Sequence, residues 1–508
     1  MGRDETQGRL EGIERDIMTS RYKTIPYRHQ IDCLNRFARR EYFALLAEMG
    51  TGKTWIAINN LAELWSSGDC FSALIFAPNG VHINWVRNEL PKHMPDWVRY
   101  RAFCWRASMS KEDEREFRNF NSPSFEGELK ILLMNHEALQ FKRGFEVAES
   151  FCKFASKLAI IIDESDAFKN PSAARTKSLM KLKKYSHWRR IMSGTPINNS
   201  PFDAYSQFNF LDESILGCQS FYAFKSEYAD MIHDGDPRMI AIKRRSGTHR
   251  VPQVVEVDKE GRPRFKNLDK LNALIAPHSF RILKKDCLDL PEKIYETIYF
   301  EMTPEQRKAY KLMEDECRLV FNSEESVVSK LTALTKLTQI TSGYVIHPGS
   351  NDPIRIEGGN PKIDRLEEQV ERIVNAGEQV IIWARYRVEI NDIAYRLERF
   401  GCKTLHGETP RDLRMEYVDD FQRGAIRVLV ANQQVGGTGL TLTNASEVIY
   451  FSNNFSLRDR MQSEDRAHRI GQTKNVTYTN LIASGTVDEK IVWCLNNKKD
   501  IADVITSF

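Results

Sequence analysis

The sequence predicts an α/β protein built from two doubly wound parallel-sheet lobes with helical protrusions. Two series of short, continuous apolar runs carry this prediction, one between residues 44 and 193 and one between residues 380 and 451. Continuous runs, unlike alternating ones, are typical of parallel strands that helices cover on both faces. Polar residues follow most of the runs, and ligands gather at the carboxyl ends of such strands.

The apolar runs are expected to be strands, and helical segments separate them. The first series comprises Ala44–Leu46, Ala73–Pro78, Ile131–Met134, Leu158–Ile162 and Arg190–Met192. The second series comprises Val380–Trp383, Thr404–Gly407, Ile426–Val430 and Val448–Phe451. Between the two series, residues 201–280 turn helical and then irregular and basic, and residues 292–345 have a helix-like pattern with a helix start at Glu301–Gln306.

Length and composition predict a globular protein of roughly three domains. The chain has 508 residues, of which 41% are hydrophobic and 28% charged, as is ordinary for soluble proteins. It contains no apolar run of about eighteen residues, so no membrane span is predicted. Its nine cysteines form no C-x-x-C pair, which argues against a zinc site and for a reducing compartment. We expect a bacterial or host-cell cytoplasm, or the nucleus if the source is eukaryotic.

Composition shifts along the chain predict six segments. They are an N-terminal tail (1–20), a first α/β lobe (21–215), a helical and basic protrusion with a linker (216–290), a second helical protrusion (291–360), a second α/β lobe (361–490) and a C-terminal brace (491–508).

The stretch Ala47–Thr54 fits the phosphate-loop pattern G-x-x-x-x-G-K-[ST], except that alanine replaces the first glycine. It stands between a predicted strand and a predicted helix, which is the context that such a loop requires. Gly50 and Gly52 would let backbone N–H groups converge on phosphate oxygens. Lys53 would reach the β- and γ-phosphates, and the Thr54 hydroxyl would hold Mg²⁺.

Asp163 and Glu164 follow the apolar run that ends at Ile162. Adjacent residues on a strand point to opposite faces, so one carboxylate can hold Mg²⁺ while the other orients and deprotonates a water. An acidic pair after a hydrophobic strand is common and is uninformative by itself. Together with a phosphate loop upstream, it predicts nucleotide hydrolysis.

The second lobe has no phosphate loop, but two of its segments could act on the first lobe's nucleotide. The glycine-rich stretch Gln434–Leu440 follows a predicted strand, although it could also be a tight turn. Arg466 and Arg469 are three residues apart and would share one face of a helix. Two guanidinium groups on one face suit a transferring γ-phosphate, while an exposed arginine pair is the alternative.

Two further features are ambiguous by themselves. The net charge is +4, which neither requires nor excludes nucleic acid. A local basic excess around Lys243, Arg244 and Arg245 could be a solvated insertion or a phosphate-contacting one. Gln30 starts an amphipathic helix upstream of the phosphate loop, and its amide could read adenine because it both donates and accepts.

Taken together, the ordered motifs resemble the Swi/Snf-type DNA translocases among the superfamily 2 helicase-like ATPases. The series is Gln30, 47–54, Pro78 with Trp85, Asn135–Glu137, Asp163–Glu164, Ser193–Pro196, Trp383, His406–Gly407, Gly436–Leu440 and Gln462–Arg469. Lys169–Asn170, the linker-like stretch Arg281–Pro291, His468–Lys474 and Gly485–Ile491 favour this branch. One departure is Asp166, where the family usually has histidine, which puts in doubt the usual contact of this position with the coupling motif.

The resemblance implies two RecA-like lobes, ATP and Mg²⁺ as cofactors, and residue roles as follows. ATP would be bound by Gln30, Glu48, Met49, Gly50, Thr51, Gly52, Lys53, Thr54, Gly437 and Gly439, and the metal by Thr54 and Asp163. Glu164, Gln462, Arg466 and Arg469 would be catalytic, and Ser193, Gly194 and Thr195 would couple hydrolysis to lobe movement. DNA would be contacted by Trp85, Asn135, Trp383, Arg385, His406, Thr438, Lys243, Arg244 and Arg245.

We therefore expect a monomeric ATP-driven translocase that contacts the backbone of double-stranded DNA irrespective of sequence. A strand-separating DNA or RNA helicase of the same superfamily is the alternative, and an unwinding assay on forked duplexes would discriminate between them. A binding protein with a degenerate ATPase is a third hypothesis, which the presence of all the expected catalytic residue types disfavours.

Overall fold

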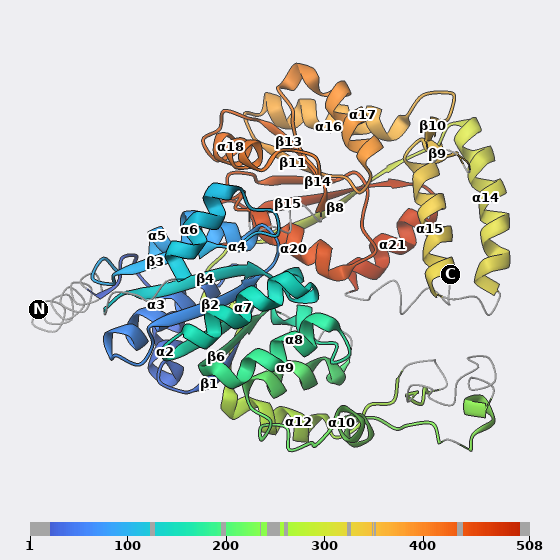
Figure 1. Cartoon of the computed structure of the whole chain (residues 1–508). Coiled ribbons are helices and arrows are strands. Elements are labelled where there is room, and N and C mark those ends of the chain that lie inside the picture. Colours follow the sequence, from blue (N-terminus) through green and yellow to red (C-terminus); the bar gives the residue numbers. More distant parts are fainter. Residues whose placement is uncertain are drawn as a thin grey trace, which may run out of the picture. The chain divides into compact units, whose positions relative to one another are not determined.

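The computed structural model divides between Cys287 and Leu288 into two compact units, Met1–Cys287 and Leu288–Phe508. It describes residues 21–121, 127–194, 200–233, 235–240, 254–258, 263–322, 327–347, 349, 352–433 and 440–497. Each unit contains one sheet in which all neighbouring strands are parallel (Figure 1). The finer segment boundaries predicted above stay predictions.

The sheet of the first unit has seven strands in the order β3-β4-β2-β5-β6-β1-β7. The strands are β1 (Tyr42–Ala47), β2 (Ser72–Ala77), β3 (Tyr100–Cys104), β4 (Leu129–Asn135), β5 (Leu158–Asp163), β6 (Ser186–Ser193) and β7 (Ser279–Ile282). Since the strands are parallel, their carboxyl ends share one edge. The phosphate loop after β1 therefore lies two strands from the acidic residue that ends β5.

Helices cover both faces of this sheet. They are α2 (Arg28–Phe37), α3 (Lys53–Ser66), α4 (Val81–Asn84), α5 (Leu90–His93), α6 (Lys111–Asn121), α7 (Lys142–Phe154), α8 (Ala174–Leu182), α9 (Ala204–Leu211), α10 (Phe221–Tyr228), α12 (Leu268–Ile275) and α13 (Lys284–Cys287). Short 3-10 or π turns join several of them, including the π turn Trp85–Glu89.

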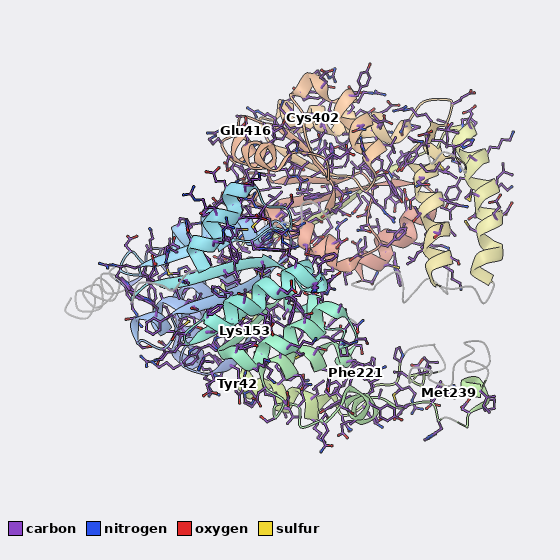
Figure 2. All side chains as sticks on the ribbon, in the orientation of Figure 1. Tyr42, Lys153, Phe221, Met239, Cys402 and Glu416 are labelled. Atoms are coloured by element: carbon purple, nitrogen blue, oxygen red, sulfur yellow. The ribbon has the colours of Figure 1, made fainter. Side chains whose placement is uncertain are left out.

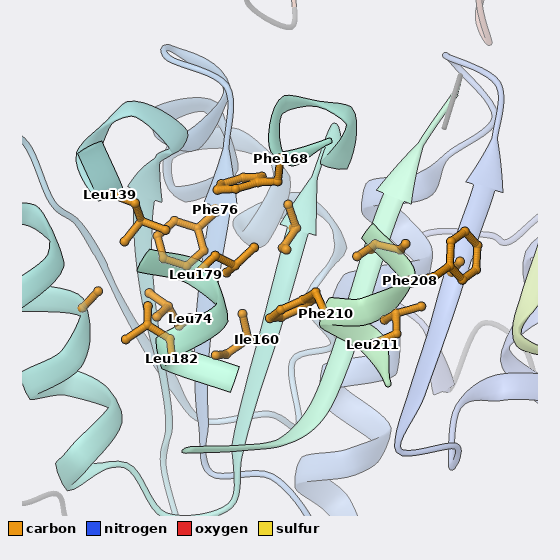
Figure 3. Packing of buried hydrophobic residues seen from close by; sticks show 14 of the residues in the cluster. Leu74, Phe76, Leu139, Ile160, Phe168, Leu179, Leu182, Phe208, Phe210 and Leu211 are labelled. Atoms are coloured by element: carbon orange, nitrogen blue, oxygen red, sulfur yellow. The ribbon is translucent and has the colours of Figure 1, made fainter. Parts of the chain in front are cut away.

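Two hydrophobic cores lie on opposite faces of the first sheet. Leu74 and Phe76 of β2 belong to one core, and their neighbours Ala73 and Ile75 belong to the other, as the two-residue period of a strand requires. Figure 3 shows the first core, in which Leu74 and Phe76 lie beside Leu179 and Leu182 of α8. Burial on both faces explains why these strands are apolar without interruption.

The sheet of the second unit has six strands in the order β12-β13-β11-β14-β15-β8. They are β8 (Lys293–Phe300), β11 (Val380–Trp383), β12 (Lys403–Leu405), β13 (Val428–Ala431), β14 (Glu447–Tyr450) and β15 (Val476–Ala483). The helices are α14 (Pro304–Asn322), α15 (Val327–Thr341), α16 (Pro361–Asn375), α17 (Arg387–Arg396), α18 (Arg411–Gln422), α20 (Leu457–Ala467) and α21 (Val487–Asn496), and β9 (Tyr344–Ile346) pairs with β10 (Pro353–Arg355) in a small antiparallel ribbon.

The fold class predicted from the sequence is confirmed, and each of the nine apolar runs overlaps a strand. The helix-like prediction for residues 292–345 is wrong at its start, because Lys293–Phe300 forms β8 and pairs in parallel with β15. β8 is an edge strand whose residues 294–297 are exposed, so it lacks the continuous apolar run of a central strand. The strands β3, β7 and β15 were not predicted.

Charged side chains lie on the outer faces of the covering helices, for example the exposed Lys153 on α7 and Glu416 on α18 (Figure 2). Within the described ranges, every helix is too short or too polar to cross a membrane.

Candidate functional site

The phosphate loop joins β1 to α3 at the carboxyl edge of the first sheet. β1 ends at Ala47 and α3 begins at Lys53. Gly50 and Gly52 have φ angles of 79° and 86°, which glycine adopts without the strain that a Cβ atom would cause. A Cβ atom at Gly52 would also lie 2.0 Å from Nε2 of Gln30, so that the Gln30 amide would have to move.

Lys53 points back into the loop that it closes. Its Nζ donates a hydrogen bond to the Ala47 carbonyl (2.9 Å) and lies 3.6 Å from Oε1 of Glu164. The Thr51 hydroxyl donates to the Glu48 carbonyl (2.8 Å) and so closes the loop on itself. Thr54 is half-buried in the first turn of α3. The lysine therefore stands at the N-terminus of a fourteen-residue helix, where anions are favoured.

Asp163 ends β5 and is almost fully buried. Its Oδ2 accepts a hydrogen bond from the indole N–H of Trp85 (3.2 Å), and its carbonyl oxygen lies 2.8 Å from Nε2 of His136. Burial and the neighbouring Glu164 carboxylate raise the pKa of Asp163 to about 7, against the lowering effect of Lys53.

Glu164 does not continue the strand, so the prediction that the two acids alternate across a strand is wrong. Its backbone is left-handed, with φ 49° and ψ 60°, a conformation that non-glycine residues adopt rarely. This turn brings its Oε1 to Lys53. Strained conformations of this kind cluster at functional sites.

The residues at this edge fit a nucleotide phosphate and Mg²⁺. Among the described residues, Oε2 of Glu164 is buried and has no hydrogen-bond partner, which is costly unless a ligand or water supplies one. The Asp163 carboxylate and the Thr54 hydroxyl offer the hard oxygen ligands that Mg²⁺ prefers. Lys53 and the glycine loop supply the cationic, donor-rich side of the site.

Gln30, which precedes the loop, and Glu48, which belongs to it, make hydrogen bonds that the sequence did not indicate. Oε1 of Gln30 accepts a hydrogen bond from the Tyr27 N–H (2.8 Å), and its Nε2 lies 3.5 Å from the Thr51 carbonyl. Glu48 uses its carboxylate to accept the backbone N–H of Lys284 (2.7 Å). Met49 is half-buried in the same loop.

Ser193 ends β6, the strand between β5 and β1, and is fully buried. Gly194 lies against the phosphate loop, since a Cβ atom there would be 3.5 Å from both the Ala47 carbonyl oxygen and the Met49 nitrogen. Thr195 lies outside the described residues. Gly194, one of the residues predicted to couple hydrolysis to lobe movement, is thus a direct neighbour of the loop.

In the second unit, Gln462 and Arg466 lie on α20, with Gln462 half-buried and Arg466 8% exposed. The helix ends at Ala467, so the prediction that Arg469 shares a helical face with Arg466 is wrong. Nη1 of Arg466 donates to the Leu440 carbonyl (3.5 Å). Gly437, Thr438 and Gly439 lie outside the described residues.

The predicted DNA contacts divide into three groups. Trp85 and Trp383 have no exposed surface and each packs in a core, so the DNA contact predicted near these two positions stays a prediction. Asn135, Arg385 and His406 are half-buried at the carboxyl ends of their strands, and the Arg385 guanidinium lies 3.8 Å from the Phe455 ring centre. Lys243, Arg244 and Arg245 lie outside the described residues.

Several residues that orient the site were missed. Trp85 binds the Asp163 carboxylate and His136 binds the backbone carbonyl oxygen of the same residue. The sequence indicates both residues only as members of the family motifs. Helix α20 is held to β8 by Lys293 and Tyr295, which both bind the buried Glu464, and Arg460 pairs with Glu464 within the helix. The (i, i+4) spacing of Arg460 and Glu464 was a usable signal, whereas nothing in the sequence pairs Lys293 with a residue 171 positions away.

The fold and the site define a phosphate-loop nucleotide-binding protein with two parallel α/β units. The sequence matches the SNF2-related domain over residues 29–344 and the helicase conserved C-terminal domain over residues 361–471. Since the first match alone covers more than half of the chain, the chain belongs to the SNF2-related family.

Named relatives are similar over most of this chain. "Protein CHROMATIN REMODELING 24" of Arabidopsis thaliana is 27% identical over 498 residues, covering 87% of this chain and 42% of its own. "ATP-dependent helicase fft1" of Schizosaccharomyces pombe is 23% identical over 518 residues, covering 91% and 50%. The chain spans half the length, or less, of the curated relatives that it matches. The solved "Sulfolobus solfataricus SWI2/SNF2 ATPase core in complex with dsDNA" is 26% identical, covers 96% of this chain and 94% of its own, and has a TM-score of 0.40.

Proposed function

We propose that this protein is an ATP-driven motor that moves along double-stranded DNA. The observation that carries the proposal is the carboxyl edge of the first sheet, where Lys53, Glu164 and Gly194 surround one phosphate loop. Membership of the SNF2-related family and relatives named as ATP-dependent helicases support ATP as the nucleotide.

In this proposal, Lys53 exchanges its bond to the Ala47 carbonyl for the β- and γ-phosphates. Thr54 and Asp163 would hold Mg²⁺, which neutralises charge on the phosphate oxygens when bound. Glu164 orients the attacking water and takes its proton at Oε2, the buried oxygen without a hydrogen-bond partner. The side chain is pre-positioned for this role because its other oxygen faces Lys53.

The second unit would supply Gln462, Arg466 and Arg469 to the same nucleotide, with Gly437 and Gly439. Arginine side chains from the second unit would stabilise the charge on the transferring phosphoryl group. Hydrolysis would then require that the second unit reach the nucleotide bound by the first. A change in the phosphate loop would be transmitted to Ser193, Gly194 and Thr195, since Gly194 lies against the loop. Such an arrangement couples turnover to motion.

DNA binding would rest on contacts to the phosphate backbone, and so would be independent of sequence and sensitive to salt. Asn135, Arg385 and His406 remain candidates because they are half-buried at strand ends. The Swi/Snf-type motifs favour movement on duplex DNA over strand separation.

The test is the steady-state ATPase rate of the full chain with duplex DNA, forked DNA, single-stranded DNA and RNA. We expect duplex DNA to stimulate the rate, and stimulation to fall as salt rises. Stimulation by RNA and not by duplex DNA would refute the proposal. A forked substrate with a labelled strand separates the two motor types, because strand release would favour the helicase alternative.

A further inference from the structure

The segment that joins the two units is fastened to the phosphate loop at its first end. β7 pairs in parallel with β1, and the Glu48 N–H donates to the Ile282 carbonyl (3.0 Å). The Glu48 carboxylate then accepts the N–H of Lys284 (2.7 Å). Glu48 therefore binds this segment through both its backbone and its side chain, at a position five residues before Lys53.

The other end of the segment is fastened to the arginine-bearing helix α20. Nε2 of His468, directly after α20, donates to the Pro291 carbonyl (2.7 Å). Lys293 donates through Nζ to Oε2 of Glu464 (3.0 Å), and the Tyr295 hydroxyl donates to the same oxygen (2.8 Å). Glu464 is 6% exposed and lies on α20 two residues from both Gln462 and Arg466.

Few residues separate the two anchored ends. Lys284 and Pro291 are seven residues apart in the sequence, and the division between the compact units falls between them. An extended chain of that length spans at most about 25 Å. Its first four residues form the helical turn α13, which is about 6 Å long and would reach about 14 Å if extended.

We infer that residues 283–292 form a tether fastened at one end to the phosphate loop and at the other to the arginine helix. Glu48, Lys293, Tyr295 and His468 are positioning residues, which act on the reaction through Lys53 and Arg466. The inference rests on the proposed function, because the tether can affect turnover only if both units bind the same nucleotide. It adds that the length of this segment sets the rate of turnover.

The test is to lengthen the tether without touching an anchor. A Gly-Ser insertion of eight residues between Leu288 and Asp289 leaves the contacts of Glu48, His468 and Glu464 in place. The effective concentration of one tethered half at the other falls with linker length, so we expect DNA-stimulated kcat to fall at least about tenfold. The Kd for a fluorescent ATP analogue should stay within about twofold of wild type, because the phosphate loop is unchanged.

The control carries the same insertion after Gly401, an exposed turn with open space around it, and should keep wild-type kcat. A lengthened tether with wild-type kcat would overturn the inference. A wild-type protein without DNA-stimulated ATPase would instead overturn the proposed function, so the two failures are distinguishable.

The distal anchor can be tested by a matched pair at His468. His468→Gln keeps an N–H donor near the Pro291 carbonyl, whereas His468→Leu removes it. We expect the leucine variant to lower kcat about fivefold with little change in KM for ATP, and glutamine to restore most of the loss. Equal loss in both variants, with a lower melting temperature, would mean a structural role only and would count against the tether.

Discussion

The two units share one architecture but use their buried charges differently. In the first unit, Oε1 of Glu164 lies 3.6 Å from Nζ of Lys53, and among the described residues Oε2 of Glu164 is buried without a hydrogen-bond partner. In the second unit, the Asp488 carboxylate accepts hydrogen bonds from the Thr341 hydroxyl (3.1 Å) and the Lys362 ammonium group (3.4 Å). The Glu464 carboxylate accepts hydrogen bonds from Arg460, Lys293 and Tyr295. The comparison indicates that the Glu164 carboxylate of the first unit is available to a ligand, whereas the Asp488 and Glu464 carboxylates of the second unit hold its elements together.

The largest loss of activity is expected on removing Lys53, whose charge would bind the nucleotide phosphates. Lys53→Ala removes the cation that would meet the phosphates, so we expect ATPase activity to fall at least about a thousandfold. The melting temperature should fall only moderately, although the variant loses the hydrogen bond to the Ala47 carbonyl and leaves Glu164 without the cation 3.6 Å away. The loss of activity should far exceed what this loss of stability accounts for. ATPase assays and calorimetry of the same preparation measure both. Wild-type turnover in this variant would refute the assignment of the site.

The next effect separates binding from turnover in the same unit. Glu164→Gln keeps the shape of the side chain but removes the proton acceptor, so kcat should fall about a thousandfold. Nucleotide binding should persist, because Lys53 and the glycine loop are unchanged. Single-turnover hydrolysis and equilibrium binding of a fluorescent ATP analogue provide the two measurements. Loss of binding in parallel with turnover would contradict the role of Glu164 as base.

The difference between the units was only partly visible in the sequence. Central strands such as Leu158–Asp163 could be predicted, because burial on both faces demands an uninterrupted apolar run. The edge strand Lys293–Phe300 could not, since its exposed face carries polar and aromatic residues. Motif spacing located Asp163 and Glu164, but the left-handed turn at Glu164 depends on tertiary contacts. Burial of Trp85 likewise depends on what packs around it, which a motif does not contain.

In the second unit, removing a buried charge should lower the free energy of unfolding. Lys362 on α16 is 1% exposed and lies 3.4 Å from Asp488 on α21, over the ring of Phe451. Lys362→Met would leave the Asp488 carboxylate buried without its cation, and we expect a loss of about 3 kcal/mol. Thermal unfolding, with hydrogen exchange to locate the change in α16 and α21, measures it.

A control for this prediction lies on the same helix. Arg365 pairs with Glu368 at 2.8 Å, but both side chains are more than half exposed. Surface pairs of this kind contribute little, so Arg365→Gln should leave the unfolding transition where it is. An equal loss in the two variants would show that burial of the pair is not what matters.

The smallest effect is expected from two tryptophans, one in each unit. Trp85→Phe removes the N–H that stabilises the ionised Asp163 carboxylate, so the pKa of Asp163 should rise and the acidic limb of kcat/KM should move to higher pH. We expect kcat/KM at pH 6.5 to fall about threefold and the value at pH 8.5 to stay near wild type. Trp383 is equally buried, but its N–H has no partner among the described residues, so Trp383→Phe should leave the pH profile unmoved. A parallel shift in both variants would mean that lost packing, and not the bond to Asp163, changes the profile.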